Sequence, residues 1–252
     1  MTVKIENLVA TTKRQFSQAQ RDFDSKVQSH QLMCRIFDKF SADDEKHNCL
    51  GCNFDDLTSQ ISKFLKVAAM NPVSFDLHHL FSMYASIINS GWERISDIFG
   101  IISIPEGYRC RHFSPFIRAR RWSNFFKHPK TFGWVVHHPV YTIDGSDHHK
   151  SLSADAGKYR FVEDEFLKKY YSSDCEKNVS KLRGEFVGHE HSTVVVLPDI
   201  VQLTVDICNC LDHFVKVITE NPVYVEMLDD TSTIADYYSR IQCVVDDTGG
   251  VP

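Results

Sequence analysis

The chain has 252 residues, with 33 acidic and 28 basic side chains and a formal net charge of −5. This length allows one large domain or two small ones with a buried core, and a mildly acidic chain is not expected to coat nucleic acid indiscriminately. No segment approaches the ~18 consecutive apolar residues of a membrane span, and residues 1–26 lack a signal-peptide pattern. Eight cysteines are too sparse for a disulfide scaffold. We therefore expect a cytoplasmic protein with reduced thiols and no membrane partner.

Apolar residues at helical spacing dominate the first part of the chain. Phe16, Phe23, Val27 and the residues that follow them predict a long amphipathic helix over 16–40. After a polar loop, a second helix is expected over 54–70, where Asn71-Pro72 ends it. The third predicted helix spans 75–101.

The next segment carries clear helix boundary signals. Ser114 is expected to cap a fourth helix, Pro115 takes its first position, and Pro129 marks its end. The rest of the chain is expected to contain a short strand or extended turn within 133–151, helices over 159–173, from Pro198 to 221 and around 230–243, and an ambiguous stretch over 176–193. The pattern therefore predicts one all-α or mainly α domain over 1–252 with irregular insertions, whose C-terminal helical part spans 190–245.

A basic, aromatic stretch without acids stands out in this mildly acidic chain. No Asp or Glu occurs between Gly107 and Ile143, and the cations in this span are Arg109, Arg111, Arg118, Arg120, Arg121, Lys127 and Lys130. Cations neutralise phosphates and aromatic rings stack on unpaired bases. We therefore expect an RNA-binding surface whose contacts are Arg118, Arg120, Lys127, Lys130 and Trp122. Core aromatics beside solvated arginines would give the same pattern.

Three polar residues of the fourth helix are expected to share a face. At about 100° per residue, Arg121, Asn124 and His128 fall within roughly 60° of one another, whereas Trp122 and its aromatic neighbours point inward. Histidine transfers protons near neutral pH, arginine stabilises charge on a phosphate, and asparagine can orient a reacting group. This face is our candidate catalytic site.

The sequence "RRWSNFFKHP" resembles the Arg-x(4–6)-His motif of the HEPN superfamily, with Arg121 and His128 as its fixed residues and Asn124 as the accompanying polar residue. The resemblance implies an all-α bundle whose core would span 53–145. It also implies an endoribonuclease that works as a homodimer. Such proteins serve as toxins or phage-defence effectors, which implies an antitoxin or another regulatory protein as a partner.

The implied reaction is attack of a ribose 2′-hydroxyl on the adjacent phosphate, which yields a 2′,3′-cyclic phosphate and a 5′-hydroxyl. In that reaction His128 would be the general base or acid, Arg121 would stabilise the transition state, and Asn124 would position the reacting groups. No metal or other cofactor is required, because the nucleophile belongs to the substrate.

Two other classes of function remain open. A non-catalytic helical module could bind RNA or a protein through residues 109–130. A zinc-binding structural protein could use His47, Cys49 and Cys52, since a Cys-x-x-Cys pair with a nearby histidine supplies much of a zinc site. In an extended segment, the His-Glu-His of 189–191 could also chelate a divalent cation.

Overall fold

The structure is a computed structural model of the chain, and it describes residues 75–126, 134–136, 160–171 and 192–230, together with Ala10, Arg14, Gln18 and scattered positions between 232 and 240. Helices make up most of these residues, which confirms the predicted mainly α-helical fold. The predicted helix over 54–70 lies outside the described residues, and so does the predicted helix over 16–40 apart from Gln18.

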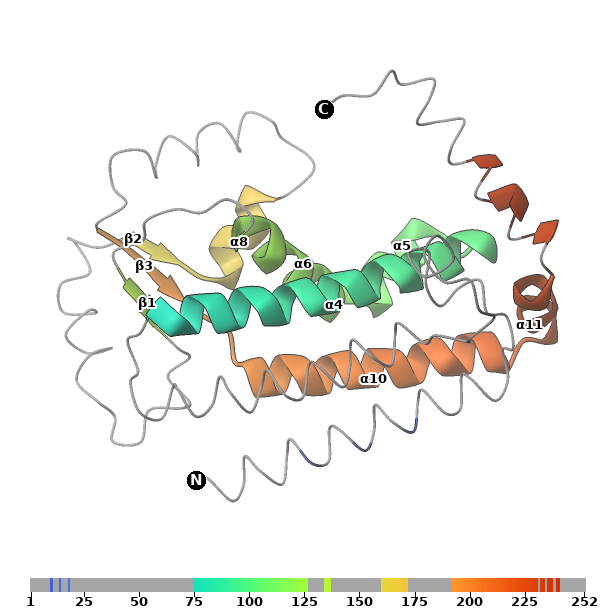
Figure 1. Cartoon of the computed structure of the whole chain (residues 1–252), viewed down its shortest axis with the longest axis horizontal. Helices are drawn as coiled ribbons and strands as arrows, with labels where there is room; N and C mark the ends of the chain where they lie inside the picture. Colours follow the sequence, from blue (N-terminus) through green and yellow to red (C-terminus); the bar gives the residue numbers. More distant parts are fainter. Residues whose placement is uncertain are drawn as a thin grey trace, which may run out of the picture.

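The two longest described helices run side by side, and the described strands lie at one end of this pair, as Figure 1 shows. The helices are α4 (Phe75–Ile101), α5 (Glu106–His112), α6 (Ser114–Phe126), α8 (Asp164–Tyr170), α10 (Ile200–Thr219) and α11 (Pro222–Asp229). The strands are β1 (Trp134–Val136), β2 (Arg160–Val162) and β3 (Thr193–Val196). Helix α6 occupies the central position, because it packs against α4, α5, α8 and α10.

The three strands form a parallel sheet in the order β1-β3-β2. Trp134 pairs with Val194 on one side of β3, and Phe161 pairs with the same residue on the other side. Thr193, Val194 and Val195 are buried, as expected for the central strand of a parallel sheet that is covered on both faces. The sheet is small and joins segments that lie far apart in the sequence.

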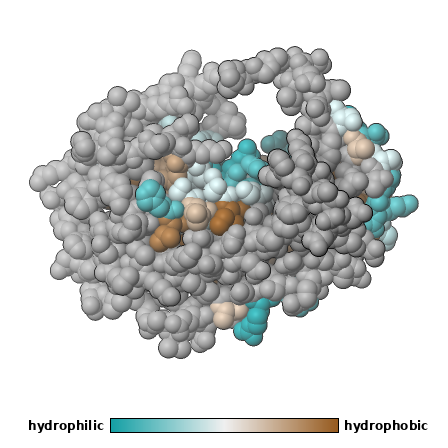
Figure 2. Space-filling view, in the orientation of Figure 1, coloured by the Kyte–Doolittle hydropathy of each residue, from teal (hydrophilic) through white to brown (hydrophobic). Residues whose placement is uncertain are grey.

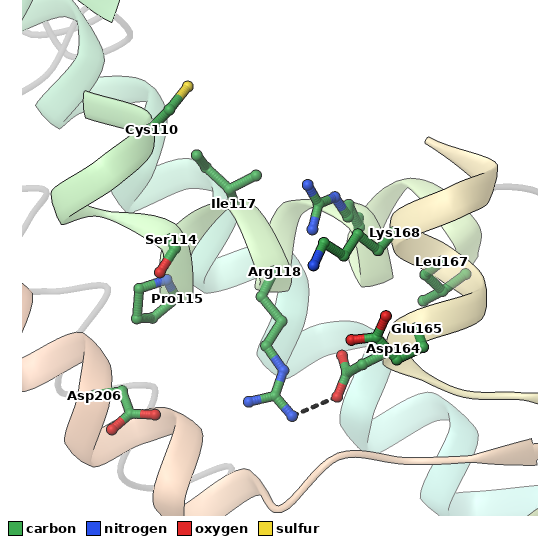
Figure 3. Close-up of a pocket in the computed structure, with 11 residues that line it drawn as sticks. Cys110, Ser114, Pro115, Ile117, Arg118, Asp164, Glu165, Leu167, Lys168 and Asp206 are labelled. Atoms are coloured by element: carbon green, nitrogen blue, oxygen red, sulfur yellow. Dashed lines mark hydrogen bonds and ion pairs between the residues drawn. The ribbon is translucent and has the colours of Figure 1, made fainter. Parts of the chain in front are cut away.

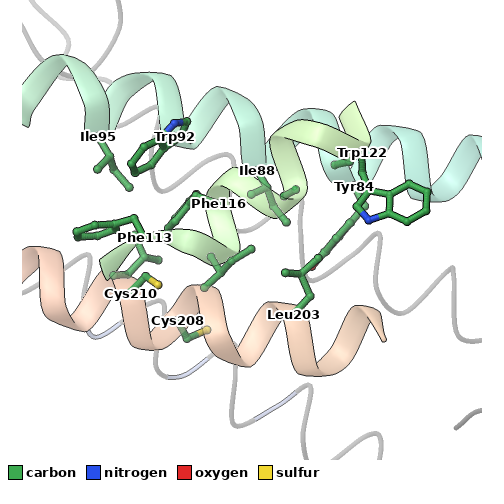
Figure 4. Close-up of a cluster of buried hydrophobic side chains, with 14 of the residues drawn as sticks. Tyr84, Ile88, Trp92, Ile95, Phe113, Phe116, Trp122, Leu203, Cys208 and Cys210 are labelled. Carbon is green, nitrogen blue, oxygen red and sulfur yellow. The ribbon is translucent and has the colours of Figure 1, made fainter. Parts of the chain in front are cut away.

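Aromatic side chains fill the space between α4, α6 and α10, as Figure 4 shows. Phe81 of α4 meets Trp122 of α6 edge-on at a centroid distance of 5.4 Å. Trp92 stacks on Phe116 at 5.5 Å, in the offset or edge geometries that aromatic pairs prefer. The buried positions of α6 recur at helical spacing, so one face of this helix belongs entirely to the core.

The end of α4 is set by a residue in the left-handed region. Ser103 has φ 57°, and the amide of Ile104 donates to the carbonyl of Phe99 at 2.8 Å. This 6→1 hydrogen bond is typical of a Schellman ending, in which glycine is the usual left-handed residue. Pro105 follows and prevents the helix from continuing.

The structure confirms α4 over 75–101, corrects two other boundaries and adds helices α5 and α11. Ser114 is the first helical residue of α6 rather than its cap, and the carbonyl of Phe113 accepts hydrogen bonds from the first turn. Residues 160–162 form a strand, so the helix predicted over 159–173 is wrong in its first turn. Helix α11 was not predicted, although Asn221 caps it by accepting from the amide of Val223 at 3.1 Å.

Tyr84 joins α4 to α10 inside the core. Its side chain is fully buried, its hydroxyl lies 2.9 Å from Oγ1 of Thr204, and Oγ1 of Thr204 in turn lies 2.6 Å from the carbonyl of Ile200. Thr204 therefore donates to Ile200, and Tyr84 donates to Thr204. Burial raises the pKa of Tyr84, so the hydroxyl keeps its proton and stays a donor.

Replacing Tyr84 with phenylalanine removes this donor without leaving a large cavity. We expect Tyr84→Phe to lower the free energy of unfolding in urea by about 1 kcal/mol, the usual net value of a buried hydrogen bond. In a double-mutant cycle, the combined loss of unfolding free energy caused by Tyr84→Phe and Thr204→Val should be less than the sum of the two separate losses. Unchanged stability of the Tyr84→Phe protein would contradict the role given to this bond.

Candidate functional site

A pocket of about 580 Å³ opens between α6, α8 and α10, with α5 at its edge (Figure 3). This volume lies within the range of small-molecule sites in proteins. Three cations, three carboxylates and five uncharged residues line it. The cations are Arg118, Arg121 and Lys168, and the carboxylates are Asp164, Glu165 and Asp206. The uncharged residues are Cys110, Ser114, Pro115, Ile117 and Leu167. The pocket therefore combines both signs of charge on a single concave surface.

Asp164 ties α8 to α6 through two hydrogen bonds. One carboxylate oxygen accepts from the indole Nε1 of Trp122 at 2.8 Å, and the other forms an ion pair with Arg118. Figure 3 shows the Arg118 side chain reaching from α6 to Asp164. Asp164 is also the first residue of α8, where a negative charge is favourable beside the free amides of the helix start.

The charge of Arg118 is held in place by its neighbours. Burial disfavours the charged form and would lower the pKa of Arg118, but the hydrogen bond and charge of Asp164, with the charge of Asp206, raise this pKa overall. The guanidinium thus stays charged, and its charge is offset by the carboxylate of Asp164. Arg118 acts mainly as a structural link between the two helices.

Arg121 and Lys168 differ from Arg118 in that no ion pair of either residue is recorded within the described part of the chain. Arg121 is half-buried on α6, and Lys168 is exposed one turn after Asp164 on α8. Figure 3 shows Lys168 pointing across the pocket towards α6. The two side chains supply positive charge to the pocket from two different helices, as an anion site requires.

The other predicted site residues fall in three groups. Arg120 is exposed and Asn124 is half-buried on α6, but neither lines the pocket. The prediction that Trp122 contacts RNA is wrong, because its ring is 0% exposed and packs in the core. Lys127, His128 and Lys130 lie outside the described residues, as do His47, Cys49, Cys52 and residues 189–191.

Four charged residues of the pocket were not found by sequence reasoning. Asp164, Glu165 and Lys168 come from α8 and Asp206 comes from α10, whereas attention to the acid-free stretch pointed only to α6. Asp164 and Lys168 stand at positions i and i+4 of a helix and so lie on one side of it, which is a signal that these two residues act together. That this side faces α6 depends on tertiary packing alone.

Two cysteines of α10 are buried in the core. Burial raises the pKa of Cys208, and raises that of Cys210 to about 12, so neither thiol is ionised at neutral pH. Among the described residues, no three His, Cys, Asp or Glu side chains lie where they could share a metal ion. No helix in this part of the chain is both long enough and apolar enough to cross a membrane.

A cluster of three rings joins α5 to α10 beside the pocket. The hydroxyl of Tyr108 lies 2.7 Å from Nε2 of His213, and the rings of His112 and His213 stack at a centroid distance of 5.0 Å. The ring of Tyr108 lies 4.3 Å from that of His112. Burial, followed by the charges of His112 and Lys216, lowers the pKa of His213, so this imidazole is neutral near pH 7.

Comparisons with known proteins add no relative. No protein-family model, curated protein or solved structure matches the chain. The resemblance to the HEPN superfamily therefore rests on Arg121, His128 and their spacing, and the function must be argued from the site.

Loss of Asp164 should loosen the contact between α6 and α8. Asp164→Ala leaves the buried indole N–H of Trp122 without an acceptor and Arg118 without its ion pair, so we expect the free energy of unfolding to fall by about 2 kcal/mol. Asp164→Asn should recover part of the loss, since an amide oxygen still accepts from the indole. The neighbouring Glu165→Ala, which removes an exposed carboxylate, serves as the control, and equal effects of the two alanine variants would contradict this role.

The ring cluster should make stability depend on pH. Because the pKa of folded His213 lies below its ordinary value of 6.5, the unfolded chain takes up the proton first as the pH falls. The stabilisation is therefore complete above the ordinary pKa and declines below it. Between about pH 7.5 and about pH 5, the unmodified protein should lose more unfolding free energy in urea than His213→Asn does, whereas equal losses would contradict this assignment.

Proposed function

We propose that this chain is a metal-independent endoribonuclease of the HEPN type that binds single-stranded RNA at the pocket between α6 and α8. The observation that carries the proposal is the convergence of Arg121 and Lys168 on one pocket, with no ion pair of either residue recorded in the described part of the chain. A phosphodiester is the natural ligand for two such cations. Arg121 is also the arginine of the motif, so the pocket and the resemblance point to the same side chain.

The two cations offer different contacts to a phosphate. The guanidinium of Arg121 provides paired N–H donors in a fixed plane that match two phosphate oxygens, whereas the ammonium of Lys168 adds a compact charge on a flexible stem. Charge that develops on the phosphorane is stabilised most by donors that are already positioned, and Arg121 lies on a helix whose other face is locked in the core.

The chemistry follows from the motif. A general base removes the proton of the ribose 2′-hydroxyl, the oxygen attacks the adjacent phosphorus, and the P–O5′ bond breaks as an acid protonates the leaving oxygen. His128 follows the end of α6 by two residues, and we assign it this proton transfer. Asn124 is assigned to orient His128 or the hydroxyl. Dimerisation, cytoplasmic action and control by a partner protein in toxin or defence systems come with the resemblance.

A second candidate is a binding module without catalysis. The carboxylates of Asp164, Glu165 and Asp206 equal the cations of the pocket in number, and a polyanion is attracted less strongly by such a balanced surface. Mixed charge suits a protein partner or a zwitterionic ligand. In that function Arg121 would matter for binding and His128 would not.

The test is cleavage of total RNA by the purified protein in excess EDTA. We expect His128→Ala to reduce the rate at least 100-fold, because a general acid or base contributes that much, and Arg121→Ala to reduce it about 100-fold or more. Lys168→Ala should weaken RNA binding several-fold, whereas Lys169→Ala, which removes the adjacent exposed lysine outside the pocket, should leave both binding and cleavage unchanged. The products should carry 2′,3′-cyclic phosphates.

Each contrary outcome has a definite meaning. RNA binding that depends on Arg121 and Lys168 without any cleavage would replace the endoribonuclease by the binding module. If the unmodified protein and all its variants bind and cleave RNA equally, neither function belongs to this pocket. Circular dichroism of each variant confirms that the helices remain folded.

A further inference from the structure

The ring cluster of Tyr108, His112 and His213 lies two turns further along α10 than Asp206, a residue of the pocket. Asp206, which lines the pocket, and His213 lie seven positions apart on this helix. Seven residues make two turns, so the two side chains leave α10 within about 20° of one another and about 10 Å apart along its axis. Helix α5 reaches both places, but from opposite faces: Cys110 lines the pocket, whereas Tyr108 and His112 belong to the cluster.

The cluster is accessible and is rich in rings. His112 is exposed, and Tyr108 and His213 are half-buried. The ring of Phe113 backs the cluster at 5.8 Å from His213. The cluster therefore has a hydrophobic base in the core and an outer side that includes an exposed imidazole, and unpaired bases stack on flat side chains of this kind.

The surroundings of the cluster favour a negatively charged chain. Arg109 and Arg111 belong to α5, Lys216 lies one turn beyond His213 on α10, and Asp212 and Glu106 are the nearby acids in the sequence of these two helices. The Nε atom of Arg109 is buried, with no hydrogen-bond partner within the described part of the chain. Burial lowers the pKa of His213 most, and the neighbouring His112 and Lys216 lower it further, so no described carboxylate is among the groups that shift this pKa.

We propose that Tyr108, His112 and His213 form a second subsite, which takes the unpaired base of a nucleotide near the phosphate held by Arg121 and Lys168. This inference rests on the proposed function of the pocket, and it identifies the substrate as extended single-stranded RNA that follows α10. The pocket holds the backbone by charge, and the ring cluster holds a base by stacking. A double-stranded substrate, whose bases are paired and stacked on one another, does not fit this arrangement.

Two labelled oligonucleotides separate stacking from charge. The first is a 2′-O-methyl pentaadenylate, which the proposed chemistry cannot cleave, and the second has the same 2′-O-methyl sugar-phosphate backbone without bases. Affinities from fluorescence anisotropy are compared for the unmodified protein, His112→Ala, Arg121→Ala and the control His79→Ala. His79 is an exposed histidine of α4 that belongs neither to the ring cluster nor to the pocket.

We expect His112→Ala to bind the pentaadenylate at least about 5-fold more weakly and to bind the abasic strand as the unmodified protein does, because stacking on an aromatic side chain is worth about 1 kcal/mol or more per base. Arg121→Ala should weaken both ligands, and His79→Ala neither. Tyr108→Phe, which keeps the ring and loses the hydroxyl, should stay close to the unmodified protein.

The failures can be told apart. If Arg121→Ala weakens binding but His112→Ala binds the pentaadenylate normally, the second subsite is wrong and the pocket stands. Equal weakening of both ligands by His112→Ala also overturns the subsite, because it would show a contribution from charge rather than from stacking. If Arg121→Ala changes nothing, or if the unmodified protein binds neither strand, the proposed function of the pocket fails and this inference fails with it.

Discussion

The buried face of α6 is the constraint on which the rest of the structure depends. Phe116, Ala119, Trp122 and Phe126 lie between α4 and α10, and together they fix the rotation of the helix about its axis. A helix that is held on one side presents its other side in a defined direction, so Arg121 faces the pocket because its neighbours are locked in the core. The arginines and the aromatics of this basic stretch thus have separate structural roles that depend on each other.

Asp164 extends this constraint to a second helix. Its carboxylate accepts from Trp122, which belongs to the core, and pairs with Arg118, which lies at the edge of the core. Helix α8 is thereby held beside α6, and Lys168, one turn further along, is brought to the pocket. The ion pair uses one of the three pocket cations for structure, and for the other two, Arg121 and Lys168, the described region records no ion pair. The proposed site therefore consists of the two pocket cations that neither the core nor Asp164 engages.

The helices could be predicted from the sequence wherever periodicity and boundary residues agree. The apolar spacing over 75–101 and the proline at 115 placed α4 and the start of α6 within a residue, and the inward direction of Trp122 followed from helix geometry. Strand β1 falls within 133–151, where a short strand or extended turn was expected, but β2 and β3 escaped prediction, because so short an apolar run has no measurable period. The hydrogen bond between Trp122 and Asp164 could not be predicted either, since the two residues are 42 positions apart and no local pattern links them. The meeting of His112 and His213 depends in the same way on how α5 packs against α10.

The central claim is that RNA lies in the pocket against Lys168, and lysine footprinting tests it directly. The protein is acetylated with and without an uncleavable 2′-O-methyl oligonucleotide, and the modification of each lysine is measured by mass spectrometry. Lys168 and Lys169 are adjacent and both exposed, but only Lys168 lines the pocket. We predict that the oligonucleotide protects Lys168 and leaves the modification of Lys169 unchanged. Equal protection of the two lysines, or protection of neither, would contradict the account.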